Sequence, residues 1–315
     1  VSFELHRGET FAIVGESGCG KSTTGKCILR LPEPTSGKAI LDGEDFTALK
    51  GEALTKARQK MKLIFQDPYS SLNPRMTVSD IIAEPIDIAG TYKPKAERDA
   101  RVEEIMKAVG LDLEFKYRYP HEFSGGQRQR IGIARAIVLE PEIVVCDEPV
   151  SALDVSVQAK VSNLLIELQK KLGLSYIFIS HDLSVVKHIS DTVMVMYLGH
   201  TMELASKKDL YANPLHPYTK ALLDVIPRIR HERIQDKKIL EGDVPSPTNP
   251  PKGCVFHTRC TSCMKVCPER APEMHEVEPG HFCTCHLFDK DLTKAERQLE
   301  LNETLAAEEK ADALS

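Results

Sequence analysis

Short apolar runs recur along the chain and are separated by longer stretches with helical periodicity. The runs lie at residues 11–15 (FAIVG), 61–66 (MKLIFQ), 143–147 (IVVCD), 175–180 (SYIFIS) and 193–198 (VMVMYL). Short, almost wholly apolar runs are typical of strands that are buried on both faces of a parallel sheet. Since helical patterns alternate with these runs, the sequence predicts an α/β domain with a mainly parallel sheet.

The helical patterns occupy residues 21–31, 77–110 and 157–172, and Gly110 provides a C-terminal stop for the second of them. The block at about residues 68–127 interrupts the alternation of strands and helices. We therefore expect a helical subdomain that is inserted into the sheet domain.

Two segments near the C-terminus have a different composition. Residues 245–251 read PSPTNPP, which predicts an extended, proline-rich spacer. The tail at residues 289–315 is charged and rich in Ala and Glu, without an apolar stripe. It is expected to be either a solvated helix or disordered.

Charge and hydropathy restrict the class of protein. The net charge of −5 argues against a protein that coats nucleic acid, so no nucleic-acid partner is expected. No apolar run approaches the roughly 18–20 residues that span a bilayer, and the first residues lack the regions of a signal peptide. We expect a cytosolic protein whose membrane contact goes through partners. The chain begins without Met in a predicted strand, so the natural N-terminus is expected to lie upstream.

Residues 15–22 (GESGCGKS) match the phosphate-loop pattern G-x-x-x-x-G-K-[ST] between a predicted strand and a predicted helix. Glycines let backbone N–H groups turn toward phosphate oxygens, and the N-terminus of the helix faces the anion. Lys21 can reach the β- and γ-phosphates, and the Ser22 hydroxyl can bind Mg²⁺. The alternative, a chance glycine turn, is disfavoured by this context. The expected ATP-binding residues of the loop are Gly15, Glu16, Ser17, Gly18, Cys19, Gly20, Lys21, Ser22 and Thr23.

Two carboxylates end the run at residues 143–147. Asp147 is placed to hold Mg²⁺ beside the phosphate loop, and Glu148 can polarise a water for attack on the γ-phosphate. Two solvated acids at the end of a strand are the alternative, which the presence of the phosphate loop disfavours.

Residues 123–130 (FSGGQRQR) open a helix that is expected to run to about Leu139. The segment resembles the signature of ATP-binding cassette (ABC) proteins, usually LSGGQ, with Phe123 in place of Leu; a flexible linker is the alternative. The resemblance implies a P-loop ABC nucleotide-binding domain that forms a head-to-tail dimer. Each ATP then lies between one subunit's phosphate loop and the other's signature. The implied signature residues are Ser124, Gly125, Gly126 and Gln127.

The other motifs of the ABC family follow in order. Gln66 resembles the Q-loop residue that contacts Mg²⁺ and the attacking water, and His181 resembles the switch histidine that orients Glu148. A structural histidine is the alternative for His181. The resemblance thus implies Glu148 and His181 as catalytic residues and Ser22, Gln66 and Asp147 at Mg²⁺. The segment that resembles the D-loop comprises Ser151, Ala152, Leu153 and Asp154.

The aromatic residue on which ABC proteins stack adenine is not found. Only Phe3 and Phe11 precede the phosphate loop, and neither is placed for that role.

Three segments, residues 66–77, 119–130 and 213–219, resemble the ATPases of oligopeptide/dipeptide importers, particularly the F-type subunit. The resemblance implies an ATP hydrolase that powers peptide import from the cytoplasmic face of the membrane as a peripheral subunit. It implies a second ATPase subunit of the D-type, two transmembrane permease subunits and an extracytoplasmic peptide-binding protein. The expected domains are an ABC ATPase domain at 1–228, a small Cys-rich C-terminal region at 229–288 and the tail at 289–315.

Other functions remain open. The same machinery can import nickel or another non-peptide solute, because the ATPase does not touch the transported ligand. Soluble ABC ATPases of translation have two cassettes, and those of chromosomes contain a long coiled coil; neither feature occurs here. A non-catalytic regulatory subunit is disfavoured by the intact Glu148 and His181.

Six of the nine cysteines crowd into residues 254–285. In a cytosolic protein such a cluster indicates a metal site rather than disulfides. The importer family has the pattern C-x5-C-x6-C…C-H and a [4Fe–4S] cluster. The resemblance selects Cys254, Cys260, Cys267 and Cys285 as ligands.

Two further cysteines depart from that pattern. With Cys263, residues 260–268 read C-x2-C-x3-C-P, which resembles the end of a ferredoxin run, so Cys263 and Cys283 are alternative ligands. Zinc, or no metal at all, is the alternative to a cluster. A redox role does not follow, because four thiolates can simply hold a short segment together.

Overall fold

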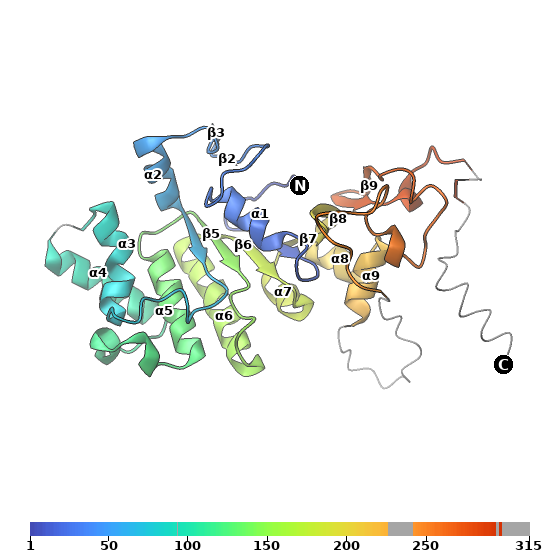
Figure 1. The fold of residues 1–315 in the computed structure, drawn as a ribbon. Coiled ribbons are helices and arrows are strands. Elements are labelled where there is room, and N and C mark those ends of the chain that lie inside the picture. Colours follow the sequence, from blue (N-terminus) through green and yellow to red (C-terminus); the bar gives the residue numbers. More distant parts are fainter. Residues whose placement is uncertain (93, 226–241, 294–295, 298–315) are drawn as a thin grey trace. The chain divides into compact units, whose positions relative to one another are not determined.

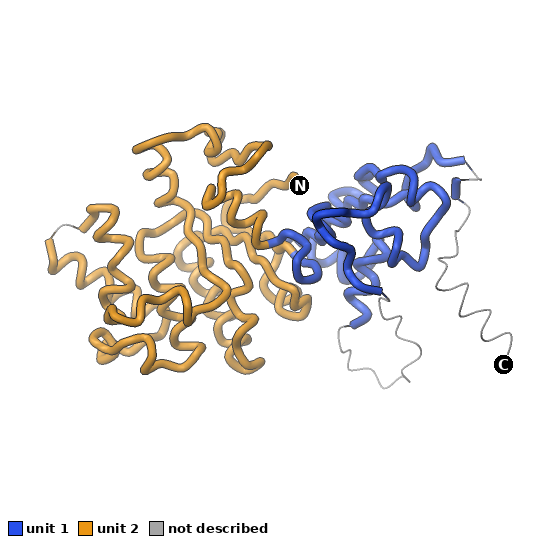
Figure 2. The backbone as a smooth tube through the Cα atoms, viewed as in Figure 1, with its two compact units in different colours: residues 1, 14–21, 192–315 blue, residues 2–13, 22–191 orange. Residues whose placement is uncertain are grey.

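The computed structural model describes residues 1–92, 94–225, 242–293 and 296–297 (Figure 1). The chain divides into two compact units (Figure 2). Unit 2 comprises Ser2–Ile13 and Ser22–Asp191, and unit 1 comprises Val1, Val14–Lys21 and the residues from Thr192 onward. In the described part of the chain, no helix combines the length and the apolar character that crossing a membrane requires.

Unit 2 contains the parallel sheet that the apolar runs predict. Its strands follow the order β4 (Met61–Ile64), β5 (Ile143–Asp147), β6 (Ser175–Ser180) and β1 (Thr10–Val14). β4 pairs with β5 and β5 with β6 in parallel. All six residues of β6 are buried, as expected for a strand covered on both faces. The predicted bounds of β5 and β6 are confirmed.

The phosphate loop leads into α1 (Lys21–Ile28), which lies very close to the sheet. A Cβ atom at Gly25 would come within 2.7 Å of Ile179 Cδ1 and 3.0 Å of Val145 Cγ1, so only glycine allows this approach. The helix ends earlier than the prediction at residue 31. Arg30 has a positive φ of 50°, and its buried guanidinium donates hydrogen bonds to the Phe46 and Leu49 carbonyls.

The helical insertion is also present in unit 2. It contains α3 (Val78–Ala89) and α4 (Lys95–Ala108), and α3 packs against both α4 and α5 (Gly125–Ile137). Thr77 caps α3 through its side chain, and Gly110 has the positive φ expected of a residue that follows a helix. The other elements of unit 2 are α2 (Gly51–Lys60), α6 (Val155–Leu172), α7 (Leu183–Ile189), the hairpin of β2 (Ile40–Leu41) and β3 (Glu44–Asp45), η1 (Leu113–Tyr117) and η2 (Pro120–Glu122).

Unit 1 is built on an antiparallel sheet that the sequence did not predict. Its order is β7 (Thr192–Tyr197), β8 (His200–Ser206), β10 (His281–Thr284) and β9 (Met274–Glu278). Every pair of neighbours in this order is antiparallel. The predicted mainly parallel arrangement therefore describes the strands of unit 2 and not those of unit 1. The remaining elements of unit 1 are α8 (Lys207–Ala212), α9 (Pro217–Asp224), η3 (His257–Arg259) and η4 (His286–Phe288).

The cysteine-rich region is joined to this sheet. Strand β10 pairs with β8, and the buried His281 lies 2.7 Å from the equally buried Glu203 carboxylate. Glu203 also accepts hydrogen bonds from the N–H groups of Leu215 and His216, which precede α9. The described part of the region thus shares one compact unit with β7 and β8. The expected boundary between residues 228 and 229 lies outside the described residues, and the division into domains stays a prediction.

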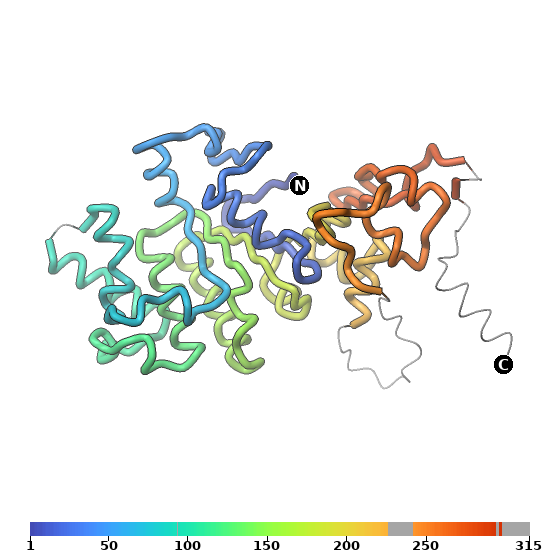
Figure 3. Tube along the Cα trace, in the orientation of Figure 1, coloured from blue at the N-terminus to red at the C-terminus, as the bar shows by residue number. Residues whose placement is uncertain are grey.

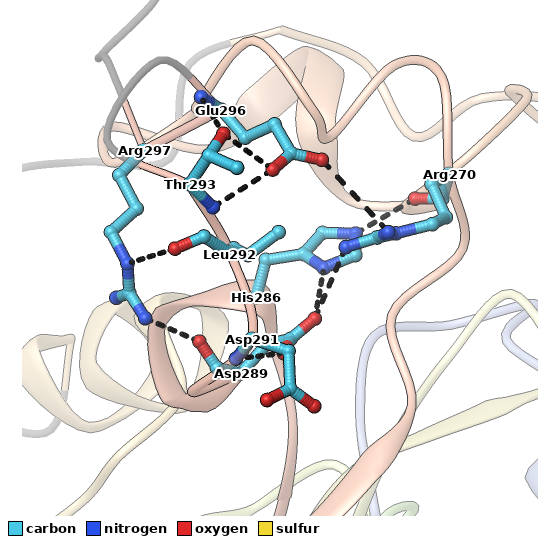
Figure 4. A network of polar contacts seen from close by, with 8 residues as sticks. All are labelled: Arg270, His286, Asp289, Asp291, Leu292, Thr293, Glu296 and Arg297. Carbon is cyan, nitrogen blue, oxygen red and sulfur yellow. Dashed lines mark hydrogen bonds and ion pairs between the residues drawn. The ribbon is translucent and has the colours of Figure 1, made fainter.

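The proline-rich spacer and the start of the tail are partly described. Residues 245–251 lie in neither a helix nor a strand, and only the residues up to 293, together with 296 and 297, are described of the tail. Figure 4 shows that these first tail residues hold polar contacts. Arg270 lies 3.2 Å from the Asp289 carboxylate, and His286 Nε2 lies 2.8 Å from the Arg270 carbonyl. Whether the rest of the tail is helical or disordered lies outside the described residues.

Candidate active site

The phosphate loop closes around its own lysine. Gly15, Gly18 and Gly20 all have positive φ, and a Cβ atom at Gly15 would lie 2.2 Å from the Met196 carbonyl oxygen. The Lys21 side chain is 4% exposed, and its ammonium donates hydrogen bonds of 2.8 Å to the carbonyls of Gly15 and Glu16. Burial raises the pKa of the neighbouring Cys19 thiol, which therefore stays protonated. The loop thus presents a buried cation within a glycine-rich turn, as phosphate binding requires.

Ser22 and Asp147, the two residues predicted to bind Mg²⁺ together, are in contact. The Ser22 hydroxyl donates a 2.5 Å hydrogen bond to Asp147 Oδ1. Asp147 is 4% exposed at the end of β5, and Lys26 Nζ lies 3.7 Å from its other oxygen. A hydroxyl and a carboxylate oxygen in contact are hard ligands that suit Mg²⁺.

Gln66 and His181 meet at the carboxylate of Glu148. Gln66 Nε2 donates to Glu148 Oε2 at 3.0 Å, and His181 Nδ1 lies 3.2 Å from the same oxygen. Each residue follows a neighbouring parallel strand: β4, β5 or β6. Ligand sites of open α/β sheets lie at these carboxyl ends. The sequence placed the three residues in one site, and the structure brings them together.

Glu148 is held in a strained conformation. Its φ of 46° lies in the left-handed region, which costs a non-glycine residue about 1–3 kcal/mol. Ser151 supports it, since the Ser151 N–H and hydroxyl both contact the Glu148 carbonyl, at 3.2 and 3.0 Å. The segment that resembles the D-loop therefore also positions Glu148 within its own chain, a role that the sequence did not indicate.

The signature segment opens α5. Ser124 caps the helix, its hydroxyl accepting from the Gln127 N–H while the Gln127 side chain accepts from the Ser124 N–H. Ser124 and Gly125 are exposed, so the first turn of α5 is accessible to an external anion. In the segment that resembles the D-loop, Ala152 and Leu153 lead to Asp154, which caps α6.

Two glycines of α5 provide a matched test of how closely this helix packs against Val157 of α6. A Cβ atom at Gly126 would lie 2.5 Å from Val157 Cγ1, whereas a Cβ atom at Gly132 meets no atom within 4 Å. We expect Gly126→Ala to lower the free energy of unfolding by about 1–2 kcal/mol, because overpacking outweighs the better helix propensity of Ala. Gly132→Ala should raise it by up to about 1 kcal/mol. Thermal unfolding of both variants measures the difference; equal effects would contradict the close contact.

The two aromatic residues that precede the phosphate loop pack against each other. The rings of Phe3 and Phe11 stack at 4.3 Å between centroids, and Phe11 is 1% exposed. Phe11 is therefore a core residue.

The six C-terminal cysteines are all buried in unit 1, and none of them forms a disulfide. A turn of the chain brings their segment back on itself. The Cys254 N–H donates a 2.7 Å hydrogen bond to the Cys267 carbonyl. Gly253 permits this approach, since a Cβ atom there would lie 2.2 Å from the same carbonyl oxygen and its φ is 69°. Cys283 and Cys285 share an apolar cluster with Leu215.

The four cysteines that the family pattern selects interact electrostatically. Burial raises the pKa of Cys254 to about 11 and those of Cys260 and Cys285 to about 12. Negative charge on Cys260, Cys254 or Cys267 raises the pKa of Cys285 further. Among the described residues, however, no three His, Cys, Asp or Glu side chains are arranged to hold one metal ion.

Cysteine thiolates are soft ligands that suit either a [4Fe–4S] cluster or a zinc ion. In a [4Fe–4S] cluster each thiolate binds a different iron, so the four sulfurs stand further apart than the ligands of one zinc ion. Burial keeps the Cys254, Cys260 and Cys285 thiols protonated, so a metal bound there would displace their protons.

Two residues of unit 1 that the sequence did not single out contact the phosphate loop. Arg259 forms an ion pair with Glu16, and the Tyr218 hydroxyl accepts a hydrogen bond from the Glu16 N–H. Both lie more than 200 positions from the loop, and no local pattern marks them.

The glycine-rich loop, the acidic pair after β5 and the capped signature helix define an ATP-binding cassette. Residues 1–151 match the family model "ABC transporter", and residues 202–267 match "Oligopeptide/dipeptide transporter, C-terminal region". The chain is similar to the oligopeptide transport ATP-binding protein AppF of Bacillus subtilis, with 56% identity over 91% of this chain and 88% of AppF. It is 50% identical to the dipeptide transport ATP-binding protein DppF of Haemophilus influenzae, over 92% of this chain and 88% of DppF.

Solved structures support the same assignment. The fold is similar to cbiO1 of Clostridium perfringens, part of the transporter complex cbiONQ, with a TM-score of 0.62 and 30% identity over 68% of this chain and 83% of cbiO1. It is also similar to the cassette MJ0796 with ADP and phosphate, with a TM-score of 0.59 and 30% identity over 65% of this chain and 88% of that chain. The chain belongs to the ATP-binding proteins of oligopeptide/dipeptide ABC transporters, and its relatives AppF and DppF are of the predicted F-type.

Proposed function

We propose that this chain is the ATP-hydrolysing subunit that powers ABC-type import of oligopeptides or dipeptides across the cytoplasmic membrane. The observation that carries the proposal is the meeting of Gln66 and His181 at the Glu148 carboxylate, beside the Ser22–Asp147 pair. The oligopeptide and dipeptide transport names of the relatives support the choice of transported ligand.

The proposed site performs in-line hydrolysis of the γ-phosphate. Glu148 accepts a proton from the attacking water, and His181 and Gln66 fix the carboxylate oxygen that does so. Lys21 neutralises negative charge on the phosphates. Bound Mg²⁺, for which Ser22 and Asp147 are the ligands and Gln66 a third candidate, would supply further charge neutralisation. Positioning and charge account for most of the catalysis in this chemistry.

The proposal includes partners. A second ATPase subunit, of the D-type, places its signature on this phosphate loop and receives the exposed signature of this chain on its own. Two permease subunits carry the transport path, and an extracytoplasmic binding protein delivers the peptide. This subunit then lies at the cytoplasmic face of the membrane as a peripheral protein.

Reconstitution tests the function. The chain is purified with its partner ATPase and permease subunits, inserted into vesicles and supplied with the binding protein, ATP and a labelled peptide. ATP-dependent accumulation of the peptide is expected. Uptake of nickel but not of peptide would show that the transported ligand is not a peptide. ATP hydrolysis without association with any permease would contradict the transport function and favour a soluble ABC ATPase.

We also propose that Cys254, Cys260, Cys267 and Cys285 hold a [4Fe–4S] cluster. Support comes from their burial, from the electrostatic interaction among them and from the family pattern they match. Cys263 and Cys283 are alternative ligands, and zinc is the alternative metal. The cluster would hold together a segment that has few apolar residues of its own.

Purification without oxygen should therefore yield about four iron atoms and four acid-labile sulfides per chain. Cys267→Ser removes a thiolate and should abolish most of this iron, whereas Cys263→Ser, three and four positions from two of the proposed ligands, should keep it. Iron and sulfide analysis together with the absorption spectrum measures both. Zinc without sulfide would contradict the cluster. Loss of iron in Cys263→Ser but not in Cys267→Ser would show that Cys263, rather than Cys267, is the ligand.

A further inference from the structure

The cysteine-rich region reaches the phosphate loop through one arginine. Arg259 belongs to η3, between Cys254 and Cys260, and its side chain is 5% exposed. Its guanidinium donates two hydrogen bonds to the Glu16 carboxylate: Nη1 to Oε2 at 2.7 Å and Nη2 to Oε1 at 3.1 Å. This bidentate geometry fixes the carboxylate in direction as well as in position.

Glu16 is in turn held at all three of its polar groups. Its carboxylate binds Arg259, its N–H donates a 2.9 Å hydrogen bond to the Tyr218 hydroxyl, and its carbonyl accepts one of 2.8 Å from Lys21. Glu16 is the second residue of the loop. Glu16 therefore links Arg259 to Lys21, the lysine that is expected to bind the phosphates.

A cluster of aromatic rings holds Arg259 in place. The Phe256 ring lies three positions before Arg259 and packs at 5.3 Å from Tyr197 and 5.2 Å from Tyr218, between centroids. The Arg259 guanidinium lies over the Tyr197 ring at 5.9 Å. Because these rings are buried, the arginine has little freedom to leave Glu16.

The ion pair with Arg259 also neutralises the negative charge of the Glu16 carboxylate. An unpaired carboxylate in a phosphate loop would repel a polyphosphate, and like charges placed close together at a binding site are costly. The Arg259 guanidinium is protonated throughout the physiological pH range, so its ion pair with Glu16 cancels this charge.

We propose that Arg259 is a positioning residue for ATP: it neutralises and orients Glu16 of the phosphate loop and so couples the cysteine-rich region to nucleotide affinity. The inference rests on the proposed ATPase function and adds to it a residue outside the cassette motifs. Its effect falls on ATP binding rather than on the chemical step, because Glu148 is untouched.

Nucleotide affinity in three variants tests the proposal. In Arg259→Gln, Glu16 is left without its cation, and the Kd and KM for Mg-ATP should rise about tenfold or more while kcat changes little. In Glu16→Gln no unpaired negative charge faces the phosphates, so the Kd should rise less than in Arg259→Gln. The double variant Arg259→Gln/Glu16→Gln should recover most of the affinity, because the two residues act as a pair.

Arg270→Gln is the matched control. Arg270 lies in the same region, but it is 52% exposed and its ion pairs go to the Asp289 and Glu296 carboxylates (Figure 4). Its ATP affinity should equal that of the wild type. The deficit of Arg259→Gln should also shrink when KCl is raised from about 0.05 M to about 0.5 M, because salt screens the repulsion.

The outcomes separate the two proposals. Wild-type protein that binds no ATP would contradict the ATPase function itself. Wild-type binding with an unchanged Kd in Arg259→Gln, or a double variant as weak as Arg259→Gln, would overturn the role of Arg259. If thermal denaturation shows that Arg259→Gln is unfolded, Arg259→Lys serves instead. Lysine keeps the positive charge but cannot form the bidentate hydrogen bonds of the guanidinium, so this variant should bind ATP more weakly than the wild type. A Kd equal to that of the wild type would overturn the proposal.

Discussion

Replacing Glu148 by Gln should lower the rate of ATP hydrolysis roughly 100- to 10,000-fold while ATP still binds, because an amide cannot accept the proton of the attacking water. The amide retains the shape of the carboxylate and an oxygen that can accept the hydrogen bond from Gln66. Phosphate release measures the rate, and equilibrium dialysis with labelled ATP measures binding.

Glu167→Gln is the control for this variant. Glu167 is an exposed carboxylate on α6, outside the site, so its removal should leave hydrolysis unchanged. A Glu148→Gln protein that hydrolyses ATP within a few-fold of the wild-type rate would show that another group takes the proton.

Lys21→Met should abolish tight ATP binding. The substitution keeps an unbranched apolar side chain of similar length but removes a cation that is 4% exposed and bonded to two loop carbonyls. Truncating one member of a buried charged pair costs about 2–5 kcal/mol, which corresponds to an increase in Kd of at least about 30-fold. Titration with a fluorescent ATP analogue measures Kd.

Lys170→Met, on the exposed surface of α6, removes the same charge from the chain without touching the loop. It should bind ATP as the wild type does. Loss of affinity in both lysine variants would indicate a general effect of net charge, and retention in both would remove Lys21 from the phosphate site.

The sequence predicted the parts of the molecule whose causes are local. β5 and β6 begin and end as predicted because each is a short apolar run that is buried on both faces. The phosphate loop could be recognised because its glycines and its lysine are close together in the sequence and form a single turn of the backbone. Asp147 ends β5 and Glu148 follows it, as predicted, because the short apolar run fixes where this strand ends.

The parts that escaped prediction depend on distant contacts. β8 and β10 form a pair across more than 70 positions, and β9 alternates exposed and half-buried residues without an apolar run. The helix α1 stops at Ile28 because Arg30 turns to bind distant carbonyls. Arg259 and Glu16 are separated by 243 positions, and nothing in either local sequence announces the other.

The pairing of β10 with β8 has a consequence for shortened forms of the protein. A fragment that stops at Asp224 would lack His281 and β10, leaving the buried Glu203 carboxylate without its ring partner and the backbone of β8 open along one side. Open strand edges recruit other chains, so such fragments should aggregate. A fusion protein that uses this ATPase in another assembly should therefore include the cysteine-rich region, or a designed strand that pairs with β8 in place of β10.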